Sequence, residues 1–308
     1  MKYLVTGGCG FIGSHIAEEL VKQGHQVRIL DNLSSGYEEN IAPIRKDVEF
    51  IKADVRDTDA LKEAVKGIQY VFHEAALVSV FDSVERPMDN NEINITGTLN
   101  VLMAAREERV KRVLIASSAA VYGNDPQLPK KETMKPQPES PYAVAKIIDE
   151  YYMTVFSKVY GLETVNLRYF NVYGPRQDPG SMYSGVISKF VDVLKKGQIP
   201  VIFGDGRQTR DFVYVKDVAR ANLLAMHSDK TGQGEVFNVA TGQQVNLLQL
   251  LEILTRIFKV QAEPVFKDAR TGDVKHSAAD ISLIKSTLDF SPQHSLEQGL
   301  QDLVSSIN

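Results

Sequence analysis

MKYLVTGGCGFIGS, residues 1–14, is the stretch that decides the fold of this chain. Residues 3–5 are an apolar run that favours a β-strand, four glycines follow within residues 7–13, and Ser14–Lys22 has a helical pattern. Glycines at such a turn let the backbone approach a pyrophosphate, and the start of the helix offers free N–H donors to it. The spacing is G-x-x-G-x-x-G, one residue different from the commonest dinucleotide-binding form. We expect a dinucleotide to be lined by Gly7, Gly10, Phe11, Ile12 and Gly13.

The end of the next strand pattern indicates which dinucleotide. Gln26–Leu30 has the pattern of a strand, and Asp31 follows it eighteen positions after Gly13. A carboxylate at this place accepts hydrogen bonds from the adenosine ribose hydroxyls and repels a 2′-phosphate. The expected cofactor is therefore NAD rather than NADP, with a ligand-free glycine turn as the alternative.

The composition is that of a globular protein, with 308 residues, 43% hydrophobic and 24% charged. A net charge of −4 gives no electrostatic reason to bind nucleic acid or an anionic membrane. The single cysteine, Cys9, excludes an intramolecular disulfide and suits a reducing compartment, and we interpret it as a small side chain that fits the glycine turn. The start has no signal-peptide pattern, and no apolar run reaches the ~18 residues of a membrane span, so a cytoplasmic location is expected. The histidines, including His73, have no metal-ligand spacing, so no metal site is expected.

Strand and helix patterns alternate through the first half of the chain. The expected strands are Val48–Ile51, Tyr70–His73, Val113–Ala116 and Thr164–Arg168. The expected helices are Thr58–Val65, Asn94–Arg109 and Tyr142–Tyr160. Such alternation implies βαβ units. The predicted fold class is α/β, a Rossmann-type doubly wound parallel sheet.

The pattern changes after Arg168. Asn171–Gly185 contains glycines and prolines and is expected to be a loop. Helix or strand patterns then follow at Val186–Lys196, Val201–Phe203, Gln249–Phe258 and Leu296–Val304. We expect a dinucleotide-binding domain of residues 1–170 with a returning segment of about 211–240. Residues 171–210 and 241–308 would form a smaller α/β substrate domain over the carboxyl edge of the sheet.

Tyr142 and Lys146 are the residues with a chemical role that their spacing explains. They are i and i+4 on one predicted helix and so share a face. An ammonium beside a phenol stabilises the phenolate, which is the form that removes a proton from a hydroxyl group. Ser118 leaves the preceding strand at the carboxyl end of the sheet, where open α/β sheets bind ligands. Its hydroxyl could hydrogen-bond the same substrate oxygen.

The chain resembles the extended short-chain dehydrogenase/reductases, and among them the nucleotide-sugar 4-epimerases, over nearly its whole length. The matching segments are TGGCGFIGSH, DNLSSG, ADVRD, FHEAA, ASSAAVYG, SPYAVAK, LRYFNVYGPRQDP, GDGRQTRDFVYVKDVA and ARTGD. The resemblance implies that NAD is held through repeated catalytic cycles and that Ser118, Tyr142 and Lys146 are catalytic.

The resemblance also implies the residues around the two ligands. Besides the glycine turn, those around NAD would be Asp31, Asn32, Asp54, Val55, Ala75, Ala76, Asn94, Ser117, Tyr142, Lys146 and Tyr169. The substrate would contact Ser118, Tyr142, Asn171, Val186, Phe203, Arg210, Arg270, Asp273 and Ser277. Arginines clamp phosphates with paired donors, which suits a nucleotide diphosphate. The alternative for Arg210 and Arg270 is an ordinary ion pair with a neighbouring aspartate.

Three details separate activities within this family. Ala119 and Ala120 stand where 4,6-dehydratases carry an acidic pair, which disfavours water elimination. UDP-glucuronate decarboxylases share most of the motifs and remain an alternative, as does another nucleotide-sugar oxidoreductase. Ser277 stands where epimerases restricted to glucose and galactose carry a tyrosine, and a small residue leaves room for a 2-acetamido group. The expected reaction is therefore C4 epimerisation of UDP-GlcNAc/UDP-GalNAc, and also of UDP-Glc/UDP-Gal, through a 4-keto sugar.

Two further expectations come from the resemblance. Family members usually dimerise through two helices of each subunit, and Asn94–Arg109 and Tyr142–Tyr160 would be those helices in a homodimer. The segment Met182–Lys189 lacks an asparagine that some epimerases place near the diphosphate, so its contact residue stays open. A non-enzymatic NAD-binding regulator is the alternative from another class, although such proteins usually lose the tyrosine or the lysine.

Overall fold

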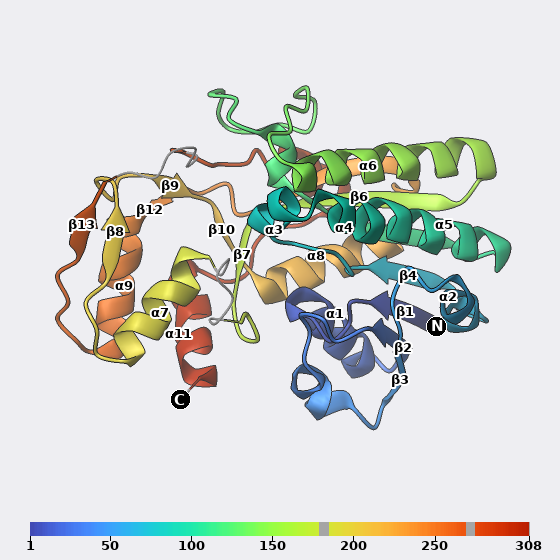
Figure 1. Ribbon diagram of the computed structural model, residues 1–308, viewed down its shortest axis with the longest axis horizontal. Coiled ribbons are helices and arrows are strands. Elements are labelled where there is room, and N and C mark those ends of the chain that lie inside the picture. The colour runs from blue at the N-terminus through green and yellow to red at the C-terminus, as the bar shows by residue number, and fades with distance from the viewer. Residues whose placement is uncertain (179–184, 269–274, 308) are drawn as a thin grey trace.

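A seven-stranded, wholly parallel sheet forms the centre of the molecule (Figure 1). The computed structural model describes residues 1–178, 185–268 and 275–307. The strands, in spatial order, are β11 (Gln233–Val239), β6 (Glu163–Tyr169), β5 (Arg112–Ser118), β4 (Tyr70–His73), β1 (Lys2–Thr6), β2 (Gln26–Asp31) and β3 (Val48–Lys52). After β1, the chain adds β2 and β3 on one side of β1. It then returns and adds β4 on the other side of β1. The carboxyl ends of β1 and β4 thus form the switch point at which such sheets bind ligands. The α/β Rossmann-type prediction is confirmed.

Alternating side chains of the strands fill two cores, one on each face of the sheet. Tyr3 and Val5 pack with α1 (Phe11–Lys22) and α8 (Val215–His227). Leu4, between them, points to the opposite face. That face is covered by α2 (Thr58–Val65), α5 (Gly97–Glu107) and α6 (Pro141–Tyr160). The sheet is buried on both faces, which explains its continuous apolar runs.

Local sequence explains where α6 begins and ends. Ser140 accepts a hydrogen bond from the Ala143 N–H (3.2 Å), and Pro141 occupies the first helical position. Gly161 ends the helix with a left-handed φ of 70°. These signals place Tyr142 in the first turn and Lys146 one turn later, at the end of the helix nearest the carboxyl edge of the sheet (Figure 1).

A smaller group of elements lies beyond that edge (Figure 1). Its core joins α7 (Val186–Lys195), α9 (Leu247–Phe258) and α11 (Leu296–Ser306). Three two-stranded ribbons accompany them, namely β7 with β10 (Asn171–Tyr173, Phe212–Tyr214), β9 with β12 (Thr209–Arg210, Val245–Asn246) and β8 with β13 (Val201–Phe203, Val265–Lys267). In the described ranges, no helix has both the length and the apolarity to cross a bilayer.

The structure differs from the sequence-based expectations in a few segments. The predicted loop Asn171–Gly185 begins with a strand, β7, because it pairs with β10 some forty residues later. The predicted helix from Asn94 begins inside a π-helical segment, η2 (Asn91–Thr96), that follows α3 (Val80–Glu85) and α4 (Pro87–Asn90). Short 3₁₀ segments occur at η1 (Glu38–Ile44) and η3 (Ala119–Tyr122). The helix α10 (Ser282–Leu288) buries Ile284 and Leu288 in the core that α1 and α8 form on one face of the large sheet. Its residues nevertheless fall in the range expected for the substrate domain.

Candidate active site

The glycine turn has the close backbone packing that a dinucleotide site requires. Gly7 has a φ of 67°, and a side chain there would meet the backbone of Ala75 at 2.6 Å. A Cβ on Gly13 would lie 2.3 Å from the Gly7 carbonyl oxygen. Among the described residues, no side chain caps the start of α1 at Gly10. The first N–H groups of α1 are therefore available to an anion, and the turn fits a pyrophosphate.

Gly13→Ala is expected to weaken NAD binding about ten-fold or more. The added methyl group would collide with backbone atoms of Gly7, which cannot move aside as a flexible side chain would, so the whole turn must shift. Fluorescence titration of NAD-free protein measures the change. Gly185→Ala is the matched control, because among the described residues its Cβ meets nothing within 4 Å. Equal NAD affinity of Gly13→Ala and the control would contradict this role of the turn.

Asp31 lies at the end of β2, as predicted, and is tied to the glycine turn. Its carboxylate accepts hydrogen bonds from the backbone N–H groups of Cys9 (2.9 Å) and Leu33 (2.8 Å). Burial raises the pKa of Asp31, and these two hydrogen bonds oppose the increase. Burial also raises the pKa of the Cys9 thiol to about 12, so this thiol stays protonated. Asp31 thus shapes the turn, and its contact with a ribose stays a prediction.

Asn32 and Asp54, both predicted around the cofactor, are in direct contact. The Asn32 amide donates to Asp54 Oδ2 (2.8 Å), and Arg56 donates to both carboxylate oxygens. The Arg56 guanidinium holds the pKa of Asp54 well below its usual range. Val55, next in the chain, is instead buried in the core against α2 and α5.

Tyr142 and Lys146 come together as the i, i+4 spacing predicts. Lys146 Nζ lies 5.9 Å from the centroid of the Tyr142 ring, and the lysine is almost fully buried. The Tyr142 N–H donates to the Ser83 hydroxyl (3.1 Å), which ties the start of α6 to α3. Ser118, the last residue of β5, accepts from the Ala120 N–H (3.1 Å). Its own O–H is thus left to donate to a substrate oxygen.

Two predicted cofactor residues use their side chains inside the protein. The Ser117 hydroxyl donates to Glu150 (2.5 Å), which forms a buried ion pair with Arg168 (2.7 Å). Asn94 is buried and exchanges hydrogen bonds with the backbone of Leu77 (2.8 and 3.0 Å). It therefore holds the segment that contains Ala75 and Ala76; both are half-buried, and Ala75 lies against Gly7 of the glycine turn.

Tyr169 reveals a buried network that the sequence did not single out. Its hydroxyl lies 2.9 Å from both Glu74 Oε1 and Asn222 Oδ1. Burial raises the pKa of Glu74 to about 7, opposed by Tyr169 and Lys146. Because one hydroxyl proton cannot serve two acceptors, a protonated Glu74 satisfies this network best. Glu74 belongs to the FHEAA segment, but nothing in that segment marks it as a functional residue. Only its burial in the folded structure does so.

Several predicted substrate residues are positioned by the small ribbons. The Asn171 amide donates to the Asp211 carbonyl oxygen (3.2 Å). The Ser277 N–H donates to the carbonyl oxygen of Thr209 (3.0 Å), which places Ser277 beside the strand of Arg210. The Asp211 carboxylate accepts hydrogen bonds from Thr241, Gly242 and Ala279. Arg270 and Asp273 lie outside the described residues.

Val186 and Phe203 come from a separate part of the smaller unit. Val186 is the first residue of α7, and Phe203 is the last of β8. Both side chains are half-buried. Their shared contact with a nucleotide stays an expectation.

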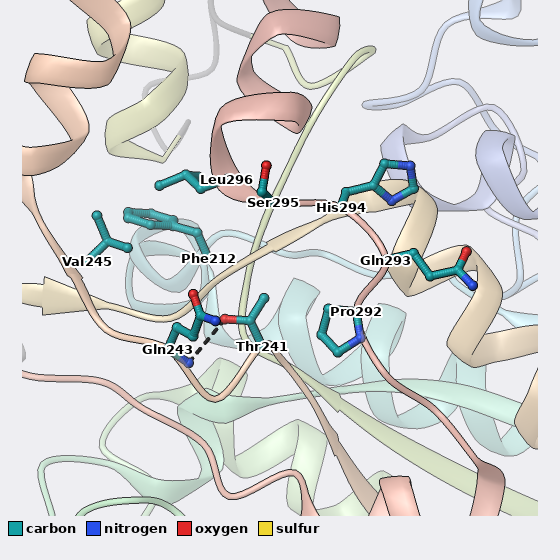
Figure 2. A pocket seen from close by; sticks show the side chains of 9 residues that line it. All are labelled: Phe212, Thr241, Gln243, Val245, Pro292, Gln293, His294, Ser295 and Leu296. Atoms are coloured by element: carbon teal, nitrogen blue, oxygen red, sulfur yellow. Dashed lines mark hydrogen bonds between the residues drawn. The ribbon is translucent and has the colours of Figure 1, made fainter.

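A cavity of about 280 Å³ lies in the smaller unit (Figure 2). Its wall combines apolar Phe212, Val245 and Leu296 with polar Gln293 and His294. Figure 2 shows these side chains coming from β10 and from the segments near 241–245 and 292–296. Val245 is the register partner of Arg210, so the cavity adjoins the strand predicted to hold the diphosphate. In the part of the chain that the structure describes, no three His, Cys, Asp or Glu side chains gather as metal ligands.

Comparison with known proteins agrees with this geometry. The NAD dependent epimerase/dehydratase family matches residues 3–240. The structure of UDP-N-acetylglucosamine 4-epimerase from Methanobrevibacter ruminantium M1, in complex with UDP-N-acetylmuramic acid, is 43% identical with a TM-score of 0.95, over 99% of this chain and 97% of that one. UDP-glucose 4-epimerase from Thermotoga maritima, with UDP-glucose, is 41% identical with a TM-score of 0.94, over 100% and 98%. A curated relative, the UDP-N-acetyl-alpha-D-glucosaminuronate decarboxylase of Bacillus cytotoxicus, is 33% identical over 98% of this chain and 96% of its own length. The chain therefore belongs to the NAD-dependent epimerase/dehydratase family and, within it, to the nucleotide-sugar 4-epimerases of the extended short-chain dehydrogenase/reductase type.

Proposed function

We propose that this enzyme interconverts UDP-GlcNAc and UDP-GalNAc, and UDP-Glc and UDP-Gal with them, by epimerisation at C4. The observation that carries the proposal is the Tyr142–Lys146 pair, a buried ammonium beside a phenol at the same sheet edge as the glycine turn. Ala119 and Ala120 follow Ser118 without an acid or base, which argues against water elimination. The likeness to epimerases of both sugar classes supports the reaction type.

The catalytic residues have complementary roles in this reaction. Tyr142 removes the proton of the sugar 4-hydroxyl, while the Lys146 ammonium stabilises the phenolate that does so. Ser118 donates a hydrogen bond to the same oxygen and orients it. NAD bound at the glycine turn would supply the reversible hydride acceptor that oxidation of the sugar at C4, and reduction of the 4-keto sugar from its other face, require. Tyr142 then gives its proton back to the oxygen, so the overall reaction consumes no reductant.

Residues of the first eighty positions would hold NAD. The glycine turn and the start of α1 suit its pyrophosphate, and Asp31 suits a ribose hydroxyl. Asn32, Asp54 and Ala75 would also line the cofactor, and Tyr142, Lys146 and Tyr169 would reach it from the other side of the sheet's carboxyl edge. Arg210 and Asn171 would hold the substrate diphosphate on the opposite side of the same edge.

Ser277→Tyr is expected to reduce turnover of UDP-GlcNAc by about 100-fold while sparing UDP-Glc. Ser277 lies beside the strand of Arg210, and a phenol ring there would fill the space needed by a 2-acetamido group. Steady-state kinetics with both sugars measures the ratio. Ser277→Ala is the control, because it keeps the space open. Equal loss with both sugars would contradict the role of this position in sugar choice.

Product analysis tests the proposed reaction. Purified protein is incubated with UDP-GlcNAc, UDP-Glc and UDP-glucuronate in separate samples without added cofactor, and NMR follows the products. UDP-GalNAc would support both the reaction and the open pocket. UDP-galactose alone would contradict the argument from Ser277. UDP-xylose from UDP-glucuronate would assign the protein to the decarboxylases, the second candidate, to which it is also similar.

We also propose that the enzyme is a homodimer. Figure 1 shows α5 and α6 side by side on one face of the sheet. Along α6, the outward face is apolar and exposed at Val144, Tyr151, Val155 and Val159. Their spacings of seven, four and four residues place them along one side of the helix. Such an apolar side suits packing against the same helices of a second copy, and light scattering measures the mass in solution.

A further inference from the structure

Asp149 is a buried carboxylate that the mechanism above leaves without a role. It lies three residues after Lys146 on α6, and its Oδ2 is 3.7 Å from Lys146 Nζ. The Asp149 side chain is 1% exposed, and the lysine side chain is 6% exposed. Within the described ranges, neither carboxylate oxygen has a hydrogen-bond partner. A buried carboxylate without donors is costly, so its presence beside a catalytic ammonium calls for an explanation.

The polar groups across from Asp149 do not satisfy it. The Thr98 hydroxyl of α5 acts on Asp149, but it donates its proton to the Asn94 carbonyl oxygen (2.5 Å). His73 of β4 is hydrogen-bonded at both ring nitrogens to threonine hydroxyls. Burial, with the Lys146 charge, lowers the pKa of His73 to about 3, so it is neutral. His73 therefore supplies no charge to Asp149, while the Thr98 hydroxyl holds the pKa of the buried carboxyl group down only in part.

The other carboxylates near Lys146 have their own partners. Glu150 is paired with Arg168 at 2.7 Å, and Glu74 is bonded to the Tyr169 hydroxyl. Asp149 is thus bonded to neither of these networks, and Lys146 is its neighbour of opposite charge. Burial raises the pKa of Asp149 to about 7, with the Lys146 ammonium opposing the increase and Glu150 adding to it.

We propose that Asp149 is a positioning residue that acts through Lys146, and that its protonation sets how strongly the ammonium promotes ionisation of Tyr142. This inference rests on the proposed function, in which Tyr142 is the base. When Asp149 is neutral, the full charge of the ammonium favours the phenolate. When Asp149 is ionised, it offsets part of that charge and favours the neutral phenol.

Asp149→Asn is expected to shift the acid limb of the kcat profile towards lower pH by about half a unit to one unit. The amide has nearly the same shape as the carboxyl group but never carries a charge, so the ammonium acts on Tyr142 without compensation. Full pH profiles of kcat with UDP-Glc measure the shift. Glu107→Gln removes the same charge from an exposed position at the end of α5 and should leave the profile unchanged.

Thermal unfolding provides a readout that does not depend on activity. A carboxyl group whose pKa is raised on folding stabilises the fold at low pH and loses that contribution as the pH rises through about 7. The Asn variant has no such loss. Its Tm relative to the natural protein should therefore be higher at about pH 8 than at about pH 5.

The outcomes separate this inference from the proposed function. A shifted acid limb with a pH-dependent gain in Tm supports the role of Asp149. A ten-fold lower kcat with an unshifted limb would mean that Asp149 only holds Lys146 in place, and would overturn it. Unchanged turnover in Tyr142→Phe would instead overturn the proposed function itself, whatever Asp149→Asn shows.

Discussion

Tyr142→Phe is expected to lower kcat by about 10³-fold for each nucleotide sugar that the enzyme accepts. The substitution removes one oxygen, the one that takes and returns the 4-hydroxyl proton. The ring stays, and so does its place beside Lys146, because the Tyr142 backbone N–H still donates to Ser83. NAD affinity and Tm should change little.

Tyr151→Phe is the matched control for this variant. It removes the same hydroxyl from the same helix at an exposed position, so its kcat should equal that of the natural protein. Single-turnover and steady-state assays with UDP-Glc, together with NAD titration, distinguish lost chemistry from lost binding. Turnover of Tyr142→Phe within a factor of about three of the control would contradict the assignment of Tyr142 as the base.

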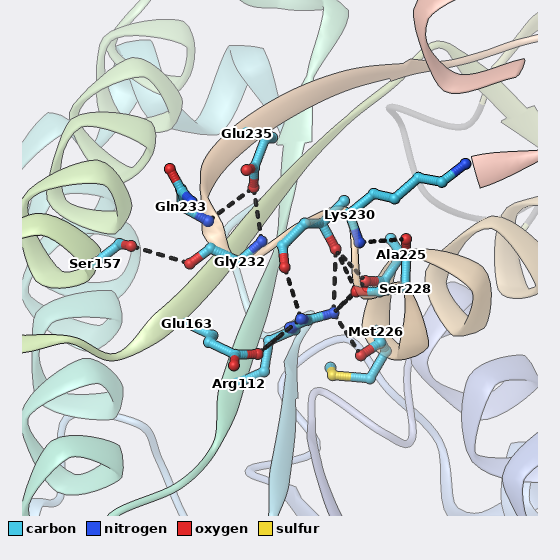
Figure 3. Close-up of polar contacts among 11 residues, drawn as sticks. Arg112, Ser157, Glu163, Ala225, Met226, Ser228, Lys230, Gly232, Gln233 and Glu235 are labelled. Atoms are coloured by element: carbon cyan, nitrogen blue, oxygen red, sulfur yellow. Dashed lines mark hydrogen bonds and ion pairs between the residues drawn. The ribbon is translucent and has the colours of Figure 1, made fainter. Parts of the chain in front are cut away.

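Arg112→Met is expected to lower the free energy of unfolding by about 3–5 kcal/mol. Arg112 is buried at the start of β5, where its guanidinium donates to the carbonyl oxygens of Ala225, Met226 and Ser228 (2.8–3.0 Å) at the end of α8. It also pairs with Glu163 at 2.7 Å, and Figure 3 shows these groups converging on it. Methionine fills similar space but leaves the carbonyl groups and the carboxylate unsatisfied.

Arg28→Met is the control for the Arg112 variant. Arg28 donates in the same way to the carbonyl oxygens of Ala64 and Lys66 near the end of α2 and pairs with Glu49, but its side chain is 18% exposed against 5% for Arg112. Water can replace its hydrogen bonds, so a loss of about 1 kcal/mol is expected. Urea and thermal unfolding measure both. Equal losses in the two variants would contradict the importance of burial.

Activity provides a second check on the Arg112 variant. Arg112 and Ser118 are the first and last residues of β5, so they are about 20 Å apart along the strand. The arginine lies at the amino end of the sheet and the site lies at the carboxyl end. Below its unfolding transition, Arg112→Met should therefore keep the kcat of the natural protein. A large fall in kcat would mean that the two ends of the sheet are coupled.

The catalytic pair could be predicted from local sequence because helix geometry alone brings positions 142 and 146 together. The same is true of the glycine turn, where a strand, close glycines and a helix follow one another. The roles of neighbouring residues could not be separated in this way. Ser117 and Ser118 are adjacent, yet Ser117 donates to buried Glu150 while Ser118 lies at the edge of the sheet. Asp31, predicted at a ribose, also binds the N–H of Cys9.

The sequence by itself determined the alternating strands and helices, the dinucleotide turn and the spacing of Tyr142 and Lys146, since each depends on residues within a few turns or one strand. Only the tertiary structure decided which polar groups are buried and what satisfies them. Arg112 finds its carbonyl partners more than a hundred residues away, β11 completes the sheet beside β6, and Asp149 comes to lie unsatisfied next to Lys146. These outcomes depend on desolvation and long-range packing, which no short pattern of residues encodes.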